Sequence, residues 1–421
     1  MWRHFLLVVG SRYRARQLFI AVLIFILMCT LSSLKTGPST DNGPRYLHRS
    51  PFRERPNLDY EHRLSRALHD IEHREQSSHK SEETPGTIWQ IFLGQEPTRE
   101  LRGEDSLTFE ERNSDWEYKV RNDFGDLEMV ISRDVSTGPH DSLACMLTLT
   151  PSYQLITSAW ADEFITSTLS SIPGLADLYY SYPHHVLRAD LLRYLILWYY
   201  GGYYADMDVF PKRTIRKCPS LRNSVFNINP PDVSLVIGIE IDEPFASPQK
   251  MREWHWVRRY GFIQYNIYAP IDSARSSARL FHIDKSSIFR GPRYDEKSTL
   301  EITGPGVFTD TVLDVLSDTL PATHRLVLAS ENLIPPGSRE PVPRVTWAPF
   351  HQLLNPLCVD ASEAKPGSHL GGLCVLPVSA WGNGQRHSGS EGFGSQRACI
   401  NHRFGGTWKP WKQSWKKYLL G

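Results

Sequence analysis

Two aspartates one residue apart, Asp206 and Asp208, are the residues of this chain with the most specific chemistry. Residues two apart in an extended backbone project to the same side, so both carboxylates can converge on one cation. Without a cation, two carboxylates at a buried strand end would repel each other and would be costly to desolvate. Hard divalent ions such as Mn²⁺ or Mg²⁺ prefer oxygen ligands. The spacing therefore predicts a divalent metal site.

The residues before this pair predict the elements that position it. From Ala189 to Tyr200 every residue is apolar or aromatic except Asp190 and Arg193, which is typical of a helix buried on nearly all sides. Gly201 and Gly202 supply the conformations that end a helix, and a strand is expected to follow. Asp190 and Arg193 share one helix face. They either form a cap and an internal salt bridge or face a ligand.

An α/β domain is expected over residues 85–421. After Pro85 and Gly86, short apolar runs alternate with longer periodic segments, the pattern of a βα-type domain. The first run, residues 87–92, predicts an opening strand. Trp89 in this run is either a core residue or a ring that stacks on a nucleotide base at the carboxyl end of the strand.

The amino terminus predicts a membrane anchor. Residues 18–34 carry no charge, and residues 1–17 before them contain arginines and no acidic residue, which predicts a cytoplasmic tail and an uncleaved transmembrane signal-anchor. The apolar run is near the lower length limit for crossing a bilayer, which favours a Golgi or ER membrane. A cleavable signal peptide is the alternative.

Residues 35–84 predict a lumenal stem. They are rich in Arg, His, Glu, Ser and Pro, with a brief helical pattern at Leu64, Leu68 and Ile71.

Composition and cysteine spacing exclude some classes of protein. With a formal net charge of +1, the chain has no bulk electrostatic attraction for nucleic acid. The six cysteines have no CxxC spacing, which argues against a structural zinc cluster. In an oxidising lumen one or two disulfides could form, and Cys358 with Cys374 is the preferred pair.

The segment ADLLRYLILWYYGGYYADMD at 189–208 resembles the DxD region of a family of retaining glycosyltransferases. This family includes the fungal initiation-specific α-1,6-mannosyltransferases and the inositolphosphoceramide mannosyltransferases. Further segments resemble the mannosyltransferase branch in the same order: TIWQ at 87–90, GIEID at 238–242, TGPGVFTD at 303–310, LPVSAW at 376–381 and NHRFGGTW at 401–408. The resemblance implies a GT-A fold, which is a Rossmann-like nucleotide-diphospho-sugar transferase domain, behind the anchor and stem.

The resemblance also implies roles for the residues around the DxD. Asp190 and Arg193 would contact the donor sugar, and Tyr204 would lie at the ribose or metal region. Asp206 and Asp208 would be the catalytic residues that hold the metal.

The carboxyl-terminal segment 402–411 resembles the HxxGxxKPW ending of related retaining galactosyltransferases. That likeness implies that His402 completes the metal shell and that Lys409 meets the phosphates. Trp408 would pack over the sugar or close the core. Neutral imidazole is a suitable ligand for Mn²⁺, although a structural histidine and a surface lysine are the plainer interpretations.

The sequence does not assign a group to the sugar face opposite the leaving group. Glu240, Asp242 and Gln264 are candidates, and ordinary strand-end residues explain them equally well.

These features predict a metal-dependent retaining glycosyltransferase of the Golgi, anchored by a single span, with its catalytic domain in the lumen. Its predicted partners are GDP-mannose as nucleotide-sugar donor and a glycan on a glycoprotein as acceptor, joined in α-1,6 linkage. Transfer to inositolphosphoceramide is an alternative, although the tail WKPWKQSWKKYLLG is too polar to span a bilayer. A non-catalytic lumenal binding protein that keeps the fold, or a metal-dependent phosphohydrolase, would be a function of a different class.

Overall fold

The computed structural model describes ten segments, all within one compact unit, Tyr46–Gly421. They are residues 58–78, 87–94, 99–113, 117–118, 152–226, 231–269, 296–331, 344–366, 368 and 371–404. The expected anchor at 18–34, Trp408 and Lys409 lie outside the described residues. In the described part of the chain, no helix combines the length and the apolar character that crossing a membrane requires.

A mixed sheet forms the centre of the unit. Its strands are β1 (Ile88–Ile91), β2 (Glu117–Tyr118), β3 (Ser152–Ile156), β4 (Gly202–Ala205), β6 (Val233–Asp242), β7 (Tyr260–Phe262), β8 (Asn266–Ala269), β9 (Leu357–Val359) and β10 (Gly372–Leu376). The strand order is β2-β3-β1-β4-β8-β6-β10-β9, with β7 added to β6. Strands β2, β3, β1 and β4 are parallel, whereas β8 runs antiparallel to both β4 and β6. The α/β class expected from the sequence is confirmed.

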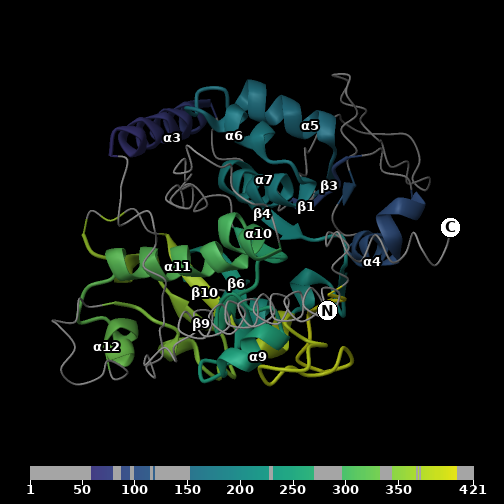
Figure 1. Cartoon of the computed structure of the whole chain (residues 1–421), viewed down its shortest axis with the longest axis vertical. Coiled ribbons are helices and arrows are strands. Elements are labelled where there is room, and N and C mark those ends of the chain that lie inside the picture. The colour runs from purple at the N-terminus through teal and green to yellow at the C-terminus, as the bar shows by residue number, and fades with distance from the viewer. Residues whose placement is uncertain are drawn as a thin grey trace, which may run out of the picture. The chain divides into compact units, whose positions relative to one another are not determined.

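Helices of very different length surround this sheet. They are α3 (Leu58–Ser78), α4 (Arg99–Arg112, kinked at Gly103), α5 (Ser158–Glu163), α6 (Leu175–Ser181), α7 (His185–Tyr200), α8 (Pro219–Ser224), α9 (Pro248–Glu253), α10 (Glu296–Ile302), α11 (Pro305–Thr319), α12 (Arg325–Glu331) and α13 (Val378–Trp381). Single turns occur at η1 (Phe164–Thr168), η2 (Ile215–Lys217), η4 (Ala348–Phe350) and η5 (Ala361–Glu363). The teal helices α5, α6 and α7 gather beside β1, β3 and β4, and the green α10 and α11 lie beside β6 and β10 (Figure 1).

Helix α7 and the two glycines after it are as the sequence predicted. Both Asp190 and Arg193 are buried in α7 together with its apolar residues. The helix ends at Gly201, where φ is 64°. A Cβ atom at Gly202 would lie 2.5 Å from the carbonyl oxygen of Thr87, so only glycine allows β4 to run this close to β1.

Helix α3 occupies part of the segment that the sequence assigns to a stem. Its residues Leu64, Leu68 and Ile71 are buried in the same hydrophobic cluster as the apolar residues of α7. The indole N–H of Trp198 in α7 also donates to Glu72 in α3, with an N–O distance of 3.3 Å. This helix therefore packs onto the domain, because its apolar residues at helical spacing form one continuous face.

The strand register brings the ends of β4 and β6 to the same edge of the sheet. Tyr203 in β4 and Val236 in β6 both pair with Tyr268 in β8, so they lie at the same level. Counting three residues onward along the two parallel strands, Ile239 is level with Asp206. Two strand spacings separate β4 from β6, about 10 Å. The DxD and the GIEID segment therefore share one edge.

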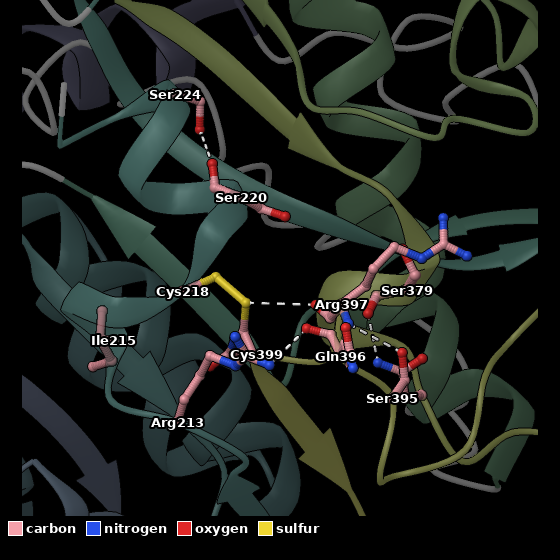
Figure 2. The surroundings of a disulfide bond; sticks show 12 residues. Arg213, Ile215, Cys218, Ser220, Ser224, Ser379, Ser395, Gln396, Arg397 and Cys399 are labelled. Atoms are coloured by element: carbon pink, nitrogen blue, oxygen red, sulfur yellow. Dashed lines mark hydrogen bonds between the residues drawn. A yellow bond between two sulfur atoms is a disulfide. The ribbon is translucent and has the colours of Figure 1, made fainter.

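A second, two-stranded sheet joins the carboxyl-terminal segment to the DxD region. It consists of β5 (Val209–Pro211) and β11 (Ile400–His402), which run antiparallel with His402 opposite Val209. Two disulfides are present among the described residues. The expected pair Cys358–Cys374 is confirmed, and Cys218–Cys399 is a second that the sequence did not single out (Figure 2).

Candidate metal centre

Asp206, Asp208 and His402 come together at one point of the structure. The two aspartates lie in the turn between β4 and β5, and His402 is the last residue of β11. One ligand atom from each residue lies within 4.8 Å of those of the other two. The Nε2 atom of His402 is 2.9 Å from Oδ1 of Asp208. The grouping that the sequence proposed from two distant segments is thus present in the fold.

Aromatic rings and backbone bonds fix the orientation of His402. Its imidazole stacks on the ring of Tyr265, with centroids 4.0 Å apart and planes 8° apart. The ring of Phe404 meets it edge-on, with centroids 4.2 Å apart. The backbone N–H of Arg403 donates to the carbonyl oxygen of Asp208 at 3.1 Å. His402 is therefore held beside the DxD from two sides.

The geometry of the three side chains fits a hard divalent cation. In an octahedral shell with ligands at about 2.1 Å, neighbouring ligand atoms lie about 3.0 Å apart. The 2.9 Å separation of the His402 nitrogen and the Asp208 oxygen matches that spacing. It is the Nε2 atom of His402 that faces Asp208, whereas the buried Nδ1 atom has no hydrogen-bond partner among the described atoms. Two carboxylates and one imidazole suit Mn²⁺ or Mg²⁺.

The position of Asp206 depends on a residue that the sequence patterns did not single out. Gln90, the last residue of TIWQ and fully buried, donates from Nε2 to the carbonyl oxygen of Asp206 at 3.2 Å. Ser106 in turn donates to Gln90 Oε1 at 2.7 Å. The hydroxyl of Tyr204 donates to the Asp206 carboxylate. A polar residue in an otherwise apolar opening strand was the available signal for Gln90.

The Asp190–Arg193 pair is both an internal salt bridge and part of the site. Its N–O distance is 2.7 Å, and each side chain is 6% exposed. The same guanidinium nitrogen lies 3.4 Å from Oδ1 of Asp206. Thr303 Oγ1 donates to Asp190 at 2.9 Å, and the guanidinium carbon lies 4.8 Å from the ring centroid of Tyr204. The structure thus brings together Asp190, Arg193 and Tyr204 beside the DxD.

The electrostatics of this edge favour a bound cation. Burial raises the pKa of Asp206, and the charge of Asp208 raises it further, while Arg193 opposes the shift. Burial also raises the pKa of Asp190, against the effect of Arg193. At the end of β6, burial raises the pKa of Glu240 to about 7, with His402 opposing and Asp206 adding to the rise. A divalent cation would stabilise the ionised form of each acid.

Trp89 lies in the core. Its ring is 4% exposed and packs near Trp160 and Tyr200, with centroid distances of 6.3 Å and 5.3 Å. Its indole N–H donates to the carbonyl oxygen of Gly201 at 2.8 Å. The described residues therefore give this ring the buried-strand role, and we propose no base contact for it.

The three candidates for the opposite sugar face have different surroundings. Asp242 is occupied by His351, whose Nδ1 lies 2.7 Å away, and by the backbone N–H of Gln352. Gln264 donates to the hydroxyl of Tyr194 and to a backbone carbonyl in a buried position. Of the three, Glu240 is the one whose charge interacts with His402 and Asp206.

Comparison with known proteins places this site in a described family region. Residues 138–227 match the "Glycosyltransferase sugar-binding region containing DXD motif", which includes α7, β4 and both aspartates.

Three curated relatives are fungal mannosyltransferases. The chain is 25% identical to an initiation-specific alpha-1,6-mannosyltransferase of Candida albicans over 59% of this chain and 60% of that protein. It is 26% identical to the protein of that name in Schizosaccharomyces pombe over 57% of this chain and 51% of the relative. A shorter match, 40% identical over 16% of this chain and 18% of the relative, is to inositol phosphoceramide mannosyltransferase 3 of S. pombe.

The first two matches span little more than half the length of those relatives. The chain thus carries a glycosyltransferase sugar-binding region with a DXD motif, and more than half of its length is similar to fungal initiation-specific α-1,6-mannosyltransferases.

Proposed function

We propose that this protein is a metal-dependent retaining glycosyltransferase that transfers mannose from GDP-mannose to N-glycans of glycoproteins in α-1,6 linkage. The observation that carries the proposal is the group formed by Asp206, Asp208 and His402, with the Arg193 guanidinium against it. Similarity to mannosyltransferases supports the choice of sugar and donor. The GT-A fold and the retained anomeric configuration are part of the proposal through the resemblance in sequence.

The residues of the site have separate tasks in this proposal. Asp206, Asp208 and His402 would hold Mn²⁺ or Mg²⁺, and the ion would supply positive charge to a diphosphate leaving group. The charge of Arg193 opposes the rise in the pKa of Asp206 and so favours the ionised ligand. Tyr204 orients the Asp206 carboxylate by its hydroxyl. The buried pair Asp190 and Arg193 borders the place where the donor sugar would lie.

Replacing each aspartate separately by alanine tests the metal site. Asp206→Ala and Asp208→Ala should lower transfer by several orders of magnitude, because neutralising a leaving group is worth roughly several kcal/mol. Calorimetric titration with Mn²⁺ should show binding to the parent and none to either variant. Asp177→Ala, which removes an exposed acid on α6, is the matched control and should behave as the parent. Near-normal turnover of either site variant would show that the pair is structural.

The short match to an inositol phosphoceramide mannosyltransferase favours one second candidate acceptor. The same enzyme preparation should be offered a high-mannose N-glycan and inositolphosphoceramide in parallel, with GDP-mannose present. Faster product formation on the lipid would replace the acceptor in our proposal and leave the donor unchanged.

We also propose a type II Golgi topology with residues 35–421 in the lumen. The arginines before the apolar run support it, and so do the two disulfides, because such bonds persist in oxidising compartments. Protease treatment of intact microsomes should spare the carboxyl-terminal part. Digestion of that part in the absence of detergent would contradict the topology.

A further inference from the structure

The strand that carries His402 has few hydrogen-bonded neighbours. Strand β11 is three residues long and pairs with β5 through Ile400, Asn401 and His402. A single bridge from Asn401 to Asn383 adds to this ladder. Short two-stranded ribbons are marginally stable in water on their own. The place of His402 beside the DxD therefore depends on restraints beyond the ladder.

The Cys218–Cys399 disulfide lies where such a restraint is needed. Cys399 directly precedes β11, and Cys218 lies between η2 and α8, a short distance along the chain after β5. Figure 2 shows the bond between these two segments, with Arg213 reaching the carbonyl oxygen of Gln396 on the same side. The backbone N–H of Lys212 also donates to the carbonyl oxygen of Cys399 at 2.8 Å.

The surroundings of this bond make it rigid. Cys218 and Cys399 are 1% and 0% exposed, and both belong to the cluster that contains Val209, Ile400 and Tyr265. Tyr265 is the residue whose ring stacks on His402. The disulfide thus joins a packed core to both strands of the small sheet, at a sequence separation of 181 residues.

We infer that the Cys218–Cys399 disulfide is a positioning bond for the metal centre. It holds β11 in register with the strand that follows the DxD, so that the His402 imidazole remains beside Asp208. This inference rests on the proposed function, since it assigns His402 to the metal. Without the bond, β11 keeps its three-residue ladder with β5, the bridge to Asn383 and the bond from the Asn401 side chain to the carbonyl oxygen of Phe393. The backbone bond from Arg403 to Asp208 also remains. These contacts alone let His402 spend part of its time away from the two aspartates.

The second disulfide supplies a matched control within the same chain. Cys358 and Cys374 face each other on β9 and β10, which pair in the main sheet, at a sequence separation of 16 residues. Removing this bond breaks a covalent link of the same type between β9 and β10, strands that do not pair with β5 or β11.

The test compares C218A/C399A with C358A/C374A in the otherwise unchanged protein. Hydrogen–deuterium exchange of the β11 amides, measured without metal, should be at least tenfold faster in C218A/C399A and parental in C358A/C374A. The Mn²⁺ dissociation constant, measured by electron paramagnetic resonance, should rise about tenfold in C218A/C399A and stay parental in C358A/C374A. A tenfold rise is the lower end of the range seen when groups that support a metal site are removed. Parental exchange and parental Mn²⁺ affinity in C218A/C399A would overturn the inference. Equal losses in both variants would also overturn it, because they would indicate general destabilisation.

A second pair of substitutions covers failure to fold. C218V/C399A restores part of the buried volume, and circular dichroism shows whether either variant keeps the parental fold. If neither folds, the bond is needed for the whole domain and the positioning role is overturned. Absence of Mn²⁺ binding by the parent would contradict the proposed function. Hydrogen–deuterium exchange of β11 reports on the restraint by the disulfide and needs no metal. The proposed function and this inference can therefore fail separately.

Discussion

Replacing Arg193 with methionine should destabilise the fold and abolish activity through one change in charge. The guanidinium lies 2.7 Å from Asp190 and 3.4 Å from Asp206, and its side chain is 6% exposed. The Arg193→Met variant leaves both acids without this positive charge in a desolvated place. Removing one partner of a buried ion pair destabilises by about 3–5 kcal/mol, and folded domains have only about 5–15 kcal/mol in total.

The pH dependence of this loss follows from the direction of the shifts. Burial raises the pKa of Asp190 and of Asp206, and Arg193 opposes both shifts, so its removal raises them further. An acid whose folded-state pKa lies above its unfolded value stabilises the fold when protonated, and that contribution is lost as pH rises through the folded pKa. The destabilisation of Arg193→Met should therefore be largest at pH 7 and smaller at pH 5.

Urea unfolding of parent, Arg193→Met and the double variant D190N/R193M provides the assay. We expect the single variant to lose about 3–4 kcal/mol at pH 7. The double variant should recover part of this loss, because the unpaired charge of Asp190 is gone while that of Asp206 remains. The amide oxygen introduced by D190N can still accept from Thr303 Oγ1, the donor to Asp190 in the parent. Transfer should remain lost in both variants. A single variant within about 1 kcal/mol of the parent at pH 7, or a double variant as unstable as the single, would refute the reasoning.

Two further substitutions test histidines, one in the candidate metal centre and one elsewhere in the domain. His402→Ala should weaken Mn²⁺ binding about 10- to 100-fold and act more mildly than loss of either aspartate, and unchanged metal dependence would remove His402 from the metal shell. Burial against Trp254 and Trp256 lowers the pKa of His387 from 6.5 to about 4. As the pH falls, the unfolded chain therefore binds a proton at this histidine before the folded protein does. The folded protein consequently loses stability between pH 6.5 and pH 4. His387→Gln should reduce this loss of stability by about 1–2 kcal/mol, less than the full pKa shift implies because the ring is partly exposed to solvent. Urea unfolding that shows the same loss of stability between pH 6.5 and pH 4 in the variant as in the parent would contradict this prediction.

Local sequence patterns predicted the part of the site that a continuous segment builds. Helix α7, its glycine end and the strand before Asp206 follow one another along the chain, so helical periodicity and turn chemistry were enough to place them. The placement of His402 came from a motif resemblance, because no local pattern relates it to residues 194 positions earlier.

The parts that the sequence left open depend on contacts between distant segments. In the sequence, Gln90 is one polar residue in a predicted strand. Its hydrogen bond to Asp206 forms because β1 and β4 pair, and the sequence did not predict this pairing. Trp89 packs against α5 and α7, and the sequence could not predict these contacts because they join segments far apart in the chain. The Cys218–Cys399 bond joins segments beside β5 and β11, and the pairing of these two strands is not encoded in the spacing of the cysteines along the chain.

Release of nucleotide from a panel of sugar donors tests the central claim most directly. The protein is incubated with Mn²⁺ and GDP-mannose, UDP-glucose or UDP-galactose, with and without a high-mannose N-glycan, and the nucleoside diphosphate is quantified. We predict Mn²⁺-dependent release of GDP, accelerated by the glycan, with both UDP-sugars at least tenfold poorer. A tenfold margin is about 1.4 kcal/mol, which one or two unsatisfied buried polar groups on the wrong base would supply. Preference for a UDP-sugar under the same conditions would contradict the mannosyl assignment, and release independent of any divalent metal would contradict the metal site itself.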